Sequence, residues 1–470
     1  MKRALVSLWV WNAAVFCLLI ACQATLAQEL SAELRHKIDG VVNDLLAKTG
    51  VPSASLAIVK DGKIAYLQAY GTARIDPPTP AKPDMRYSIG SISKQFTAAA
   101  LLMLQEQGKL SLDDKVSKFV PGLARGDEVT IRQLLSHTSG YQDFWPQDYA
   151  MPIILQPITA QQIMDMWAKK PLDFDPGTKW QYSNTNYVIA GVIAEKASGV
   201  PLVQFLHQHV FTPLGMKSIA DIDSGSLGPN DPAGYIRYAI GPLRPAPKEG
   251  HGWMFAAGEL AMTAEDLAKW DISIIDQKLM KPASYREFSK EVLLNNGVGT
   301  QYGLGVDVTN DSGRRRLEHG GEVSGFTAEN IAYPDDGAAV VVLTNQDAAA
   351  ASGLIGRGVA PLLFETADAA TAQKLEQARK IFENLQRGQV DRALFTSNAN
   401  SYFTDQTLQD FASSLGPLGT PQEFTQTRQS LRGGMTERVY RIKFPQKTLR
   451  AWTYEMPDGK LEQYMVAATE

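Results

Sequence analysis

Strand patterns lie at both ends of the first 365 residues, and helical patterns fill the stretch between them. Residues 53–60 and 63–70 are strand-like and flank Asp61-Gly62, a pair typical of a hairpin with a type I′ turn. Further strand patterns return much later, at 303–308, 315–319, 326–333 and 338–344. Strands from both ends with helices inserted between them predict an α+β fold. We expect a mostly antiparallel central sheet flanked by helices, with a helical subdomain beside it.

Helical patterns are expected to cover this sheet and to build the subdomain. One precedes the hairpin at 32–48, and another opens at Ser91 and stops at Gly108. Shorter helices are expected between residues 109 and 300, and the turn-rich segment 221–252 is expected to wall a binding cleft. A helix at 350–364 ends this unit.

A domain boundary falls near residues 367–371. We expect one domain over 32–366 and a small α+β domain over 372–470. The second opens with an amphipathic helix at 372–386 and closes with strands at 438–444, 449–456 and 460–467. Nothing in its residues indicates catalysis, so docking, dimerisation or covering the cleft are its expected roles.

The N-terminus has the form of a secretory leader. Lys2 and Arg3 precede an apolar run over residues 4–21, and small residues surround Ala27, so residues 1–27 are expected to be removed as a signal peptide. Leu19-Ile20-Ala21-Cys22 also resembles a bacterial lipobox, which would leave a lipid-anchored Cys22. We expect a periplasmic or secreted protein by the first route and an anchored one by the second.

Composition excludes several classes of partner. Both cysteines lie in the leader, and the formal net charge of −4 gives no attraction for nucleic acid. Past residue 27 no apolar run is long enough to cross a bilayer.

Metal and cofactor sites are not expected either. His207 and His209 are two apart on a helix and do not share a face, so no metal site is expected. No Gly-rich phosphate loop follows a strand, and no cofactor is implied. The sequence leaves the oligomeric state open.

Ser91-x-x-Lys94 is the first of three ordered motifs that carry chemistry. Residues three apart on a helix share a face, so the Ser91 hydroxyl and the Lys94 amine can meet. A serine nucleophile needs a base beside it, and burial can lower a lysine pKa enough for that role. Taken alone, the pair is equally well read as a helix N-cap and a solvated lysine.

Tyr182-Ser183-Asn184 is the second motif. Tyr182 is a candidate to pass a proton between Ser91 and a leaving group, and Asn184 to hold Lys94 and a substrate carbonyl. The plain alternative is a packed loop tyrosine followed by an asparagine that caps the next helix.

His319-Gly320-Gly321 is the third motif, expected at the end of a strand. Glycines there let a substrate backbone approach closely. The N–H of Glu322, together with that of Ser91, is the expected oxyanion hole. The plain alternative is a Gly-rich turn with an exposed His319.

These motifs together resemble the serine β-lactamase-like superfamily, specifically its class C branch with the related esterases, D-aminopeptidases and DD-peptidases. Stretches at 87–90, 134–140, 213–216 and 257–260 resemble the family too, and the likeness covers about residues 32–365. The resemblance implies the β-lactamase/transpeptidase-like fold. It also assigns catalysis to Ser91, Lys94 and Tyr182, with Asn184, His319, Gly321 and Glu322 around the substrate and the oxyanion.

One departure from the family pattern bears on the substrate. Class C β-lactamases usually carry Lys-Thr-Gly at the third motif, and here His319 takes the place of the lysine. A mostly neutral histidine attracts a carboxylate less. The expected activity is therefore hydrolysis of small esters or peptide-like amides through an acyl-enzyme, with weak β-lactam hydrolysis. The alternative is a penicillin- or peptidoglycan-binding protein that is acylated at Ser91 without efficient turnover. Arg314 and Arg316 alternate away from the His319 face and are expected to be solvated edge residues.

Overall fold

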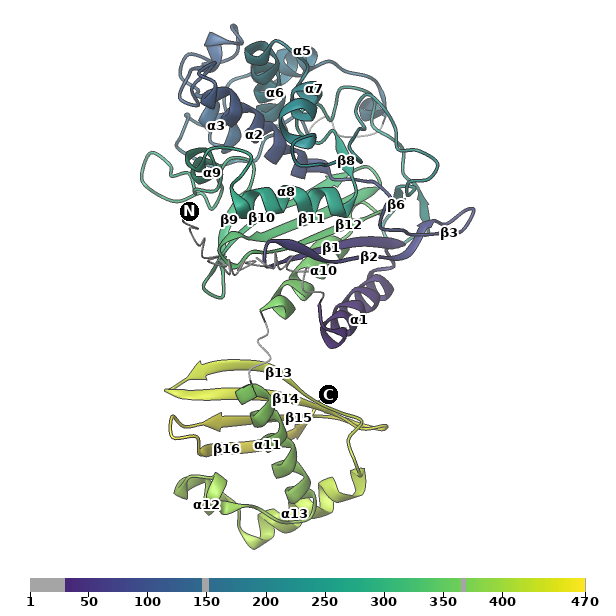
Figure 1. Cartoon of the computed structure of the whole chain (residues 1–470), viewed down its shortest axis with the longest axis vertical. Helices are drawn as coiled ribbons and strands as arrows, with labels where there is room; N and C mark the ends of the chain where they lie inside the picture. The colour runs from purple at the N-terminus through teal and green to yellow at the C-terminus, as the bar shows by residue number, and fades with distance from the viewer. Residues whose placement is uncertain (1–29, 146–151, 365–368, 470) are drawn as a thin grey trace, which may run out of the picture. The chain divides into compact units, whose positions relative to one another are not determined.

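The computed structural model describes residues 30–145, 152–364 and 369–469. The expected leader, including both cysteines, lies outside these residues. The chain divides into two compact units, one running to Phe364 and the other from Glu365 to the C-terminus. Figure 1 shows both units.

A seven-stranded antiparallel sheet forms the centre of the first unit, in the order β3-β2-β1-β12-β11-β10-β9. The N-terminal hairpin sits beside the late strands because β1 pairs with β12, with Leu56 opposite Val342. Asp61 and Gly62 both have positive φ, as a type I′ turn requires. The strands are β1 (Ser53–Lys60), β2 (Lys63–Arg74), β3 (Thr79–Pro80), β9 (Asp307–Asp311), β10 (Arg314–Val323), β11 (Phe326–Tyr333) and β12 (Ala338–Thr344).

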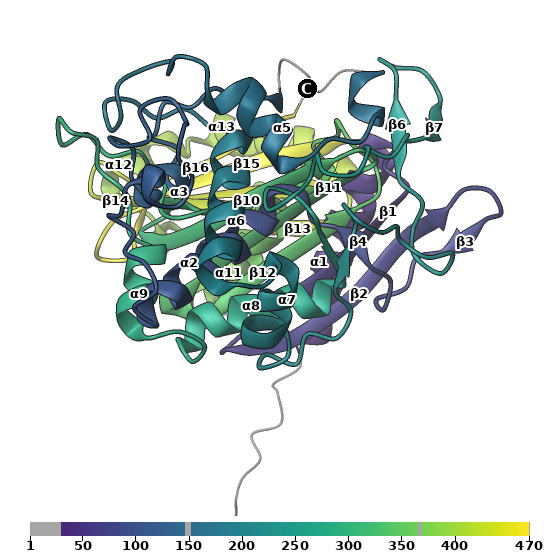
Figure 2. The same cartoon turned by 90° about the horizontal axis from the view of Figure 1, so that it is seen from above.

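Side chains alternate between two apolar cores, one on each face of this sheet. Leu56 and Ile58 of β1 face the helices α1 (Ala32–Thr49) and α10 (Ala351–Val359). Ala57 and Val59 point the other way, toward α8 (Ala264–Asp276) and the helical subdomain. Figures 1 and 2 show α8 and the subdomain on one side of the sheet, with α1 and α10 on the other in Figure 1. The core therefore fixes where the subdomain meets the sheet.

The helical subdomain is built around α2 (Ser93–Glu106), which packs against α6 (Asn184–Ser198). Most of α2 is buried, because its apolar residues surround the helix on all sides. Smaller elements complete the subdomain and its edges: η1 (Gly90–Ile92), η2 (Val116–Lys118), α3 (Ile131–Leu135), η3 (Ile153–Leu155), α5 (Ala160–Ile163), η4 (Met164–Ala168), α7 (Leu202–Leu206), η5 (His207–Phe211) and α9 (Pro282–Phe288). Outside the subdomain, η6 (Pro334–Asp336) joins β11 to β12, and η7 (Ala360–Leu363) follows α10 on the other face of the sheet. Two small sheets contain β4 (Tyr87–Ser88), β8 (Leu260–Met262) and β5 (Ala220–Asp221), and β6 (Tyr235–Arg237) with β7 (Leu243–Pro245).

The C-terminal unit has its own apolar core. A four-stranded antiparallel sheet, β13-β14-β15-β16, packs against a helix through Phe382 and Tyr440. Its elements are α11 (Ala369–Gln386), η8 (Arg392–Leu394), α12 (Ser397–Tyr402), α13 (Asp405–Leu415), η9 (Gly416–Leu418), β13 (Glu423–Arg432), β14 (Met435–Lys443), β15 (Thr448–Glu455) and β16 (Leu461–Ala468).

The structure confirms the expected fold class and corrects five local predictions. Strand β9 begins at Asp307, four residues after the predicted start, and β10 continues past His319 to Val323. Because β9 pairs with β10 over Arg314–Glu318, the two arginines are not on an edge strand. The prediction missed β13. The segment 221–252 contains β6 and β7, and none of its residues lines the cleft that contains Ser91, so it is not the expected cleft wall.

Across the residues with assigned structure, no single helix is both long and apolar enough to cross a membrane. The helix α6 followed by residues 202–211 passes that test only as a pair bent by 67°.

Candidate active site

Ser91 and Lys94 lie where the subdomain meets the sheet. Ser91 is in the 3₁₀ turn η1, which leads directly into α2, and Lys94 is the second residue of that helix. The Lys94 Nζ lies 2.9 Å from Ser91 Oγ. Lys94 is fully buried, so the reading of this residue as a solvated lysine is wrong.

Three oxygen atoms surround the Lys94 amine. Besides Ser91 Oγ, they are Asn184 Oδ1 and the Ala257 carbonyl, each 2.8 Å from Nζ. Burial lowers the pKa of Lys94 to about 7, although the nearby Asp143 carboxylate acts against this shift. At neutral pH a large fraction of the lysine is therefore an unprotonated amine, the form that can take a proton from a hydroxyl.

Tyr182 lies beside both Ser91 and Lys94. Its ring centroid is 5.0 Å from Lys94 Nζ, and it stacks on the buried ring of His137 at 4.2 Å. Burial raises the pKa of Tyr182, while a hydrogen bond with Ser91 lowers it in part. The phenol is thus protonated at neutral pH and within hydrogen-bonding reach of the serine. The buried His137 ring packs against the Tyr182 ring and supports it.

Asn184 is the first residue of α6, and its position is fixed by a residue that the sequence analysis missed. Asp143 Oδ1 accepts a hydrogen bond from the Asn184 backbone N–H at 2.9 Å, and both Asp143 oxygens lie 3.3 Å from Asn184 Nδ2. With its amide nitrogen held by Asp143, Asn184 presents Oδ1 to Lys94.

The third motif places the backbone of β10 against the backbone of the turn that carries Ser91. A Cβ at Gly321 would lie 1.9 Å from the Ile89 carbonyl oxygen and 3.3 Å from Ser91 N. A Cβ at Gly90 would lie 2.6 Å from Glu322 N. Glycine is therefore required at both positions, because the turn carrying Ser91 touches the strand at residues 321 and 322. The backbone N–H groups of Ser91 and Glu322 are brought into the same small region.

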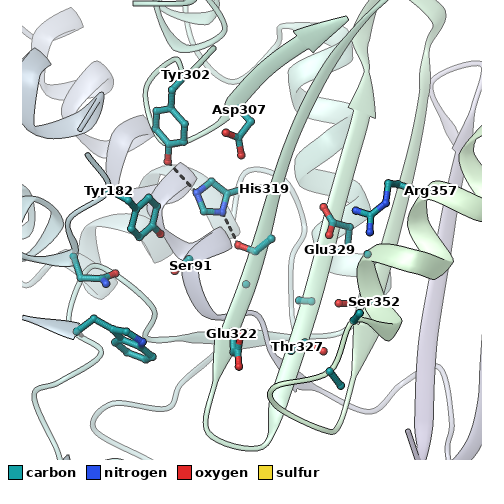
Figure 3. A pocket seen from close by; sticks show the side chains of 18 of the residues that line it. Ser91, Tyr182, Tyr302, Asp307, His319, Glu322, Thr327, Glu329, Ser352 and Arg357 are labelled. Carbon is teal, nitrogen blue, oxygen red and sulfur yellow. Dashed lines mark hydrogen bonds between the residues drawn. The ribbon is translucent and has the colours of Figure 1, made fainter. Parts of the chain in front are cut away.

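His319 lines the cleft that contains Ser91, as expected, but it lies within β10 and not at the end of the strand. It is 4% exposed, so it is not the exposed residue of the plain alternative. Its Nε2 is 2.9 Å from the Tyr302 hydroxyl, and its Nδ1 is 2.6 Å from the Gly320 carbonyl oxygen (Figure 3). Burial, and then the Lys94 charge, lower the pKa of His319 to about 4. The ring is neutral, and both nitrogens are occupied by the protein.

A cleft of about 540 Å³ opens over Ser91. One wall is aromatic, formed by Trp145, Trp180 and Tyr302 with Tyr182. The aromatic residues Phe144, Trp253, Phe255 and Phe326 pack in or against the core and are not part of this wall.

Charged residues also line the cleft. Burial raises the pKa of Asp307 to about 6 and that of Glu329 to about 7. Arg357 lines the cleft too, and Figure 3 shows Glu329 and Arg357 pointing toward one another. These three residues come from β9, β11 and α10, and no local motif in the sequence links them.

Metal ligands are not assembled anywhere in the described parts of the chain. No group of three or more His, Cys, Asp or Glu side chains there has the arrangement that would hold an ion. His207 and His209 both fall in the η5 turn, away from the cleft.

Comparison with known proteins identifies the family. The family model described as Beta-lactamase matches residues 38–360, and the chain belongs to this family. With the serine, lysine and tyrosine at one point of the cleft, the fold and the site define a serine hydrolase.

The individual relatives have low sequence identity to this chain. The chain is 29% identical over 310 residues to Penicillin-binding protein 4* of Bacillus subtilis (strain 168), covering 63% of this chain and 68% of that protein. It is 28% identical over 298 residues to a D-aminopeptidase of Brucella anthropi, covering 63% of this chain and 56% of the relative. A D-stereospecific amidohydrolase from Streptomyces sp. superposes with a TM-score of 0.61 at 27% identity, over 70% of this chain and 98% of that one.

Proposed function

We propose that this protein hydrolyses small esters or peptide-like amides through an acyl-enzyme on Ser91. The observation that carries the proposal is the buried Lys94 amine, 2.9 Å from Ser91 Oγ, with its pKa lowered to about 7. A lysine that is partly neutral at working pH is matched to the task of a general base.

The acylation step follows from the partners of Lys94. A neutral amine has two N–H donors and one lone pair. Asn184 Oδ1 and the Ala257 carbonyl accept the two N–H groups, which leaves the lone pair for the Ser91 hydroxyl proton. Ser91 Oγ then forms a bond to the substrate carbonyl carbon, and the proton passes to Lys94.

The developing negative charge needs donors beside Ser91. The N–H groups of Ser91 and Glu322 supply them in this proposal, and one such donor typically contributes about 10²–10³ in rate. Tyr182 then delivers its proton to the leaving nitrogen or oxygen as the bond to the carbonyl carbon breaks, and the proton held by Lys94 passes to the tyrosinate, which restores both groups. Lys94 next takes a proton from the water that attacks the acyl-enzyme. That proton passes to Ser91 Oγ as the ester bond breaks, so Ser91 and the acid product are released.

The substrate class rests on His319 and on the relatives. A neutral His319 with both nitrogens occupied offers no positive charge to a carboxylate. An aminopeptidase and an amidohydrolase among the similar proteins favour amide substrates of amino-acid type. β-Lactams, which often carry a carboxylate, are expected to be poor substrates. Membership of the class C branch is part of this proposal.

Cellular location enters only as a proposal. The apolar run after Lys2 and Arg3 favours export to the periplasm or the medium, with a lipid anchor on Cys22 as the second route. An acyl-transfer enzyme exported in this way would meet peptidoglycan-like or small-molecule substrates.

The test is hydrolysis of p-nitrophenyl butyrate by the wild type, by Ser91→Ala and by Ser93→Ala. Ser93 lies in the same helix start, but its hydroxyl accepts a hydrogen bond from Leu260 N. The proposal requires that turnover is lost in Ser91→Ala and kept in Ser93→Ala. Full activity in Ser91→Ala would refute it.

The second candidate is a binder that is acylated without turnover, as the similarity to a penicillin-binding protein suggests. Mass spectrometry over time after β-lactam exposure separates the two functions. A stable adduct on Ser91 supports the binder, and rapid loss of the adduct supports the hydrolase.

A further inference from the structure

Asp143 holds Asn184, which in turn contacts Lys94. Its carboxylate accepts hydrogen bonds from the backbone N–H groups of Asn184, at 2.9 Å, and Trp145, at 3.2 Å. The Asn184 side-chain amide nitrogen is 3.3 Å from each carboxylate oxygen. All these bonds reach Asp143 as an acceptor, which is the behaviour of an ionised carboxylate in a partly buried place.

The direction of the Asn184 amide decides what Lys94 can do. An asparagine amide has an acceptor oxygen on one side and two N–H donors on the other, and a half-turn exchanges them. In the observed orientation Oδ1 is 2.8 Å from Lys94 Nζ. In the flipped one, an N–H₂ group would face the lysine and would compete with Ser91 for its lone pair.

We propose that Asp143 is a positioning residue for acylation: by holding the Asn184 amide nitrogen, it keeps Oδ1 on Lys94 and directs the lysine lone pair to Ser91. This inference rests on the proposed hydrolase function and adds a residue to its machinery. Asp143 itself touches neither Ser91 nor Lys94 through any hydrogen bond of the described structure.

The charge of Asp143 has a second, separable effect on Lys94. Besides Asp143, the groups that face the lysine are Ser91 and Asn184 at hydrogen-bonding distance, the rings of Tyr182 and Tyr187 at 5.0 and 5.5 Å, and the neutral His137 and His319. Among the residues that the structure describes, Asp143 is the carboxylate whose charge acts on Lys94. It raises the pKa of Lys94 against the effect of burial, so its loss lowers that pKa further.

Two substitutions separate orientation from charge. In Asp143→Asn the side-chain oxygen still accepts from Asn184, but the negative charge is gone. In Asp143→Ala both the acceptor and the charge are removed. Asp173→Asn is the matched control, because Asp173 is exposed and accepts a hydrogen bond from Gln181, one residue before Tyr182, without contacting Asn184.

The experiment measures kcat and KM for p-nitrophenyl butyrate from about pH 5 to 9 in the full-length protein, with a melting temperature for each variant. Activity requires neutral Lys94, so it rises with pH through the lysine pKa. Asp143→Asn is expected to keep most of kcat and to move this rise to lower pH. Asp143→Ala is expected to lose about 100-fold in kcat with little change in KM, as misplacement of catalytic groups typically does.

A merely structural role for Asp143 would lower the melting temperature and leave the pH profile of the folded fraction unchanged. A kcat for folded Asp143→Ala equal to that of Asp173→Asn would overturn the inference, and an unshifted rise in Asp143→Asn would overturn the effect of the Asp143 charge on Lys94. If Asp143→Ala does not fold, Asp143→Leu, which removes the same acceptor with less loss of volume, takes its place. Activity that survives Ser91→Ala refutes the proposed function instead, so the two failures are distinguishable.

Discussion

The Tyr302 hydroxyl lies 2.9 Å from Nε2 of His319, and this contact changes the meaning of the third motif. With Nδ1 donating to the Gly320 carbonyl, Nε2 is the acceptor, and the Tyr302 hydroxyl is its donor. The histidine is therefore held neutral between a phenol and a backbone carbonyl. In place of the charged lysine of class C β-lactamases, the strand has a residue whose side chain bonds to its own backbone beside Ser91.

This arrangement predicts how substrates with a free carboxylate behave. Because burial holds the pKa of His319 near 4, the histidine gains no charge between about pH 5.5 and 8, and preference for a carboxylate should not change there. The measurement is the ratio of kcat/KM for an acid substrate and its carboxamide across that range. A ratio that rises as the pH falls through about 6.5 would show instead that His319 becomes charged and binds the carboxylate.

The two glycines after His319 should respond differently to substitution. Gly321→Ala would place a Cβ 1.9 Å from the Ile89 carbonyl oxygen, so the strand must move away from the turn that carries Ser91. We expect a lower melting temperature and a loss of about 100-fold in kcat/KM. Gly320→Ala is the control, because its Cβ would meet no atom closer than 3.9 Å. Equal losses in both variants would contradict the close approach.

The buried lysine should reduce stability over a defined pH range. Burial lowers the pKa of Lys94 from 10.5 to about 7, so the unfolded chain binds this proton more tightly than the folded one. The cost is full below pH 7, falls as the pH rises and vanishes above 10.5. Lys94→Met removes this dependence, although it also removes hydrogen bonds at every pH.

The check is the free energy of unfolding of both proteins from pH 6 to 10. Wild type should gain stability relative to Lys94→Met as the pH rises. A difference that is constant with pH would mean that the lysine remains charged in the fold.

Removing the C-terminal unit should leave the chemistry intact. All the residues assigned to the site lie before Phe364, and the C-terminal unit has a separate core that includes Phe382 and Tyr440. A chain lacking residues 371–470 is expected to hydrolyse p-nitrophenyl butyrate with unchanged Ser91 dependence. Activity and molecular mass of both chains in solution provide the measurement. Loss of activity in a folded truncated chain would assign the C-terminal unit a part in catalysis.

Local sequence patterns predicted the parts of this structure that depend on local forces. Strands β11 and β12 end where their apolar patterns end, and Asp61-Gly62 forms the turn that its composition indicates. Strand β13 was missed because its sequence is largely polar, which an edge strand permits. The glycines of the third motif hid the continuation of β10, since they lack the side chains that mark a strand.

The sequence motifs indicate the site residues, but they do not reveal the contacts that support them. Helix spacing points to Ser91 and Lys94, and the order of the motifs points to Asn184. Asp143 acts through an amide 41 residues away, and Tyr302 through a ring 17 residues away, so no local spacing reveals either. The state of His319 depends on its burial, which a motif does not encode.

The acyl-enzyme on Ser91 is tested most directly by detecting the adduct itself. p-Nitrophenyl butyrate is mixed with the protein, the reaction is stopped with acid during turnover, and the protein is digested for mass spectrometry. An acyl-enzyme mechanism predicts an acyl adduct on the peptide that contains Ser91 in the wild type and none in Ser91→Ala. Turnover with an unmodified Ser91 peptide, or with the adduct on another residue, would contradict it.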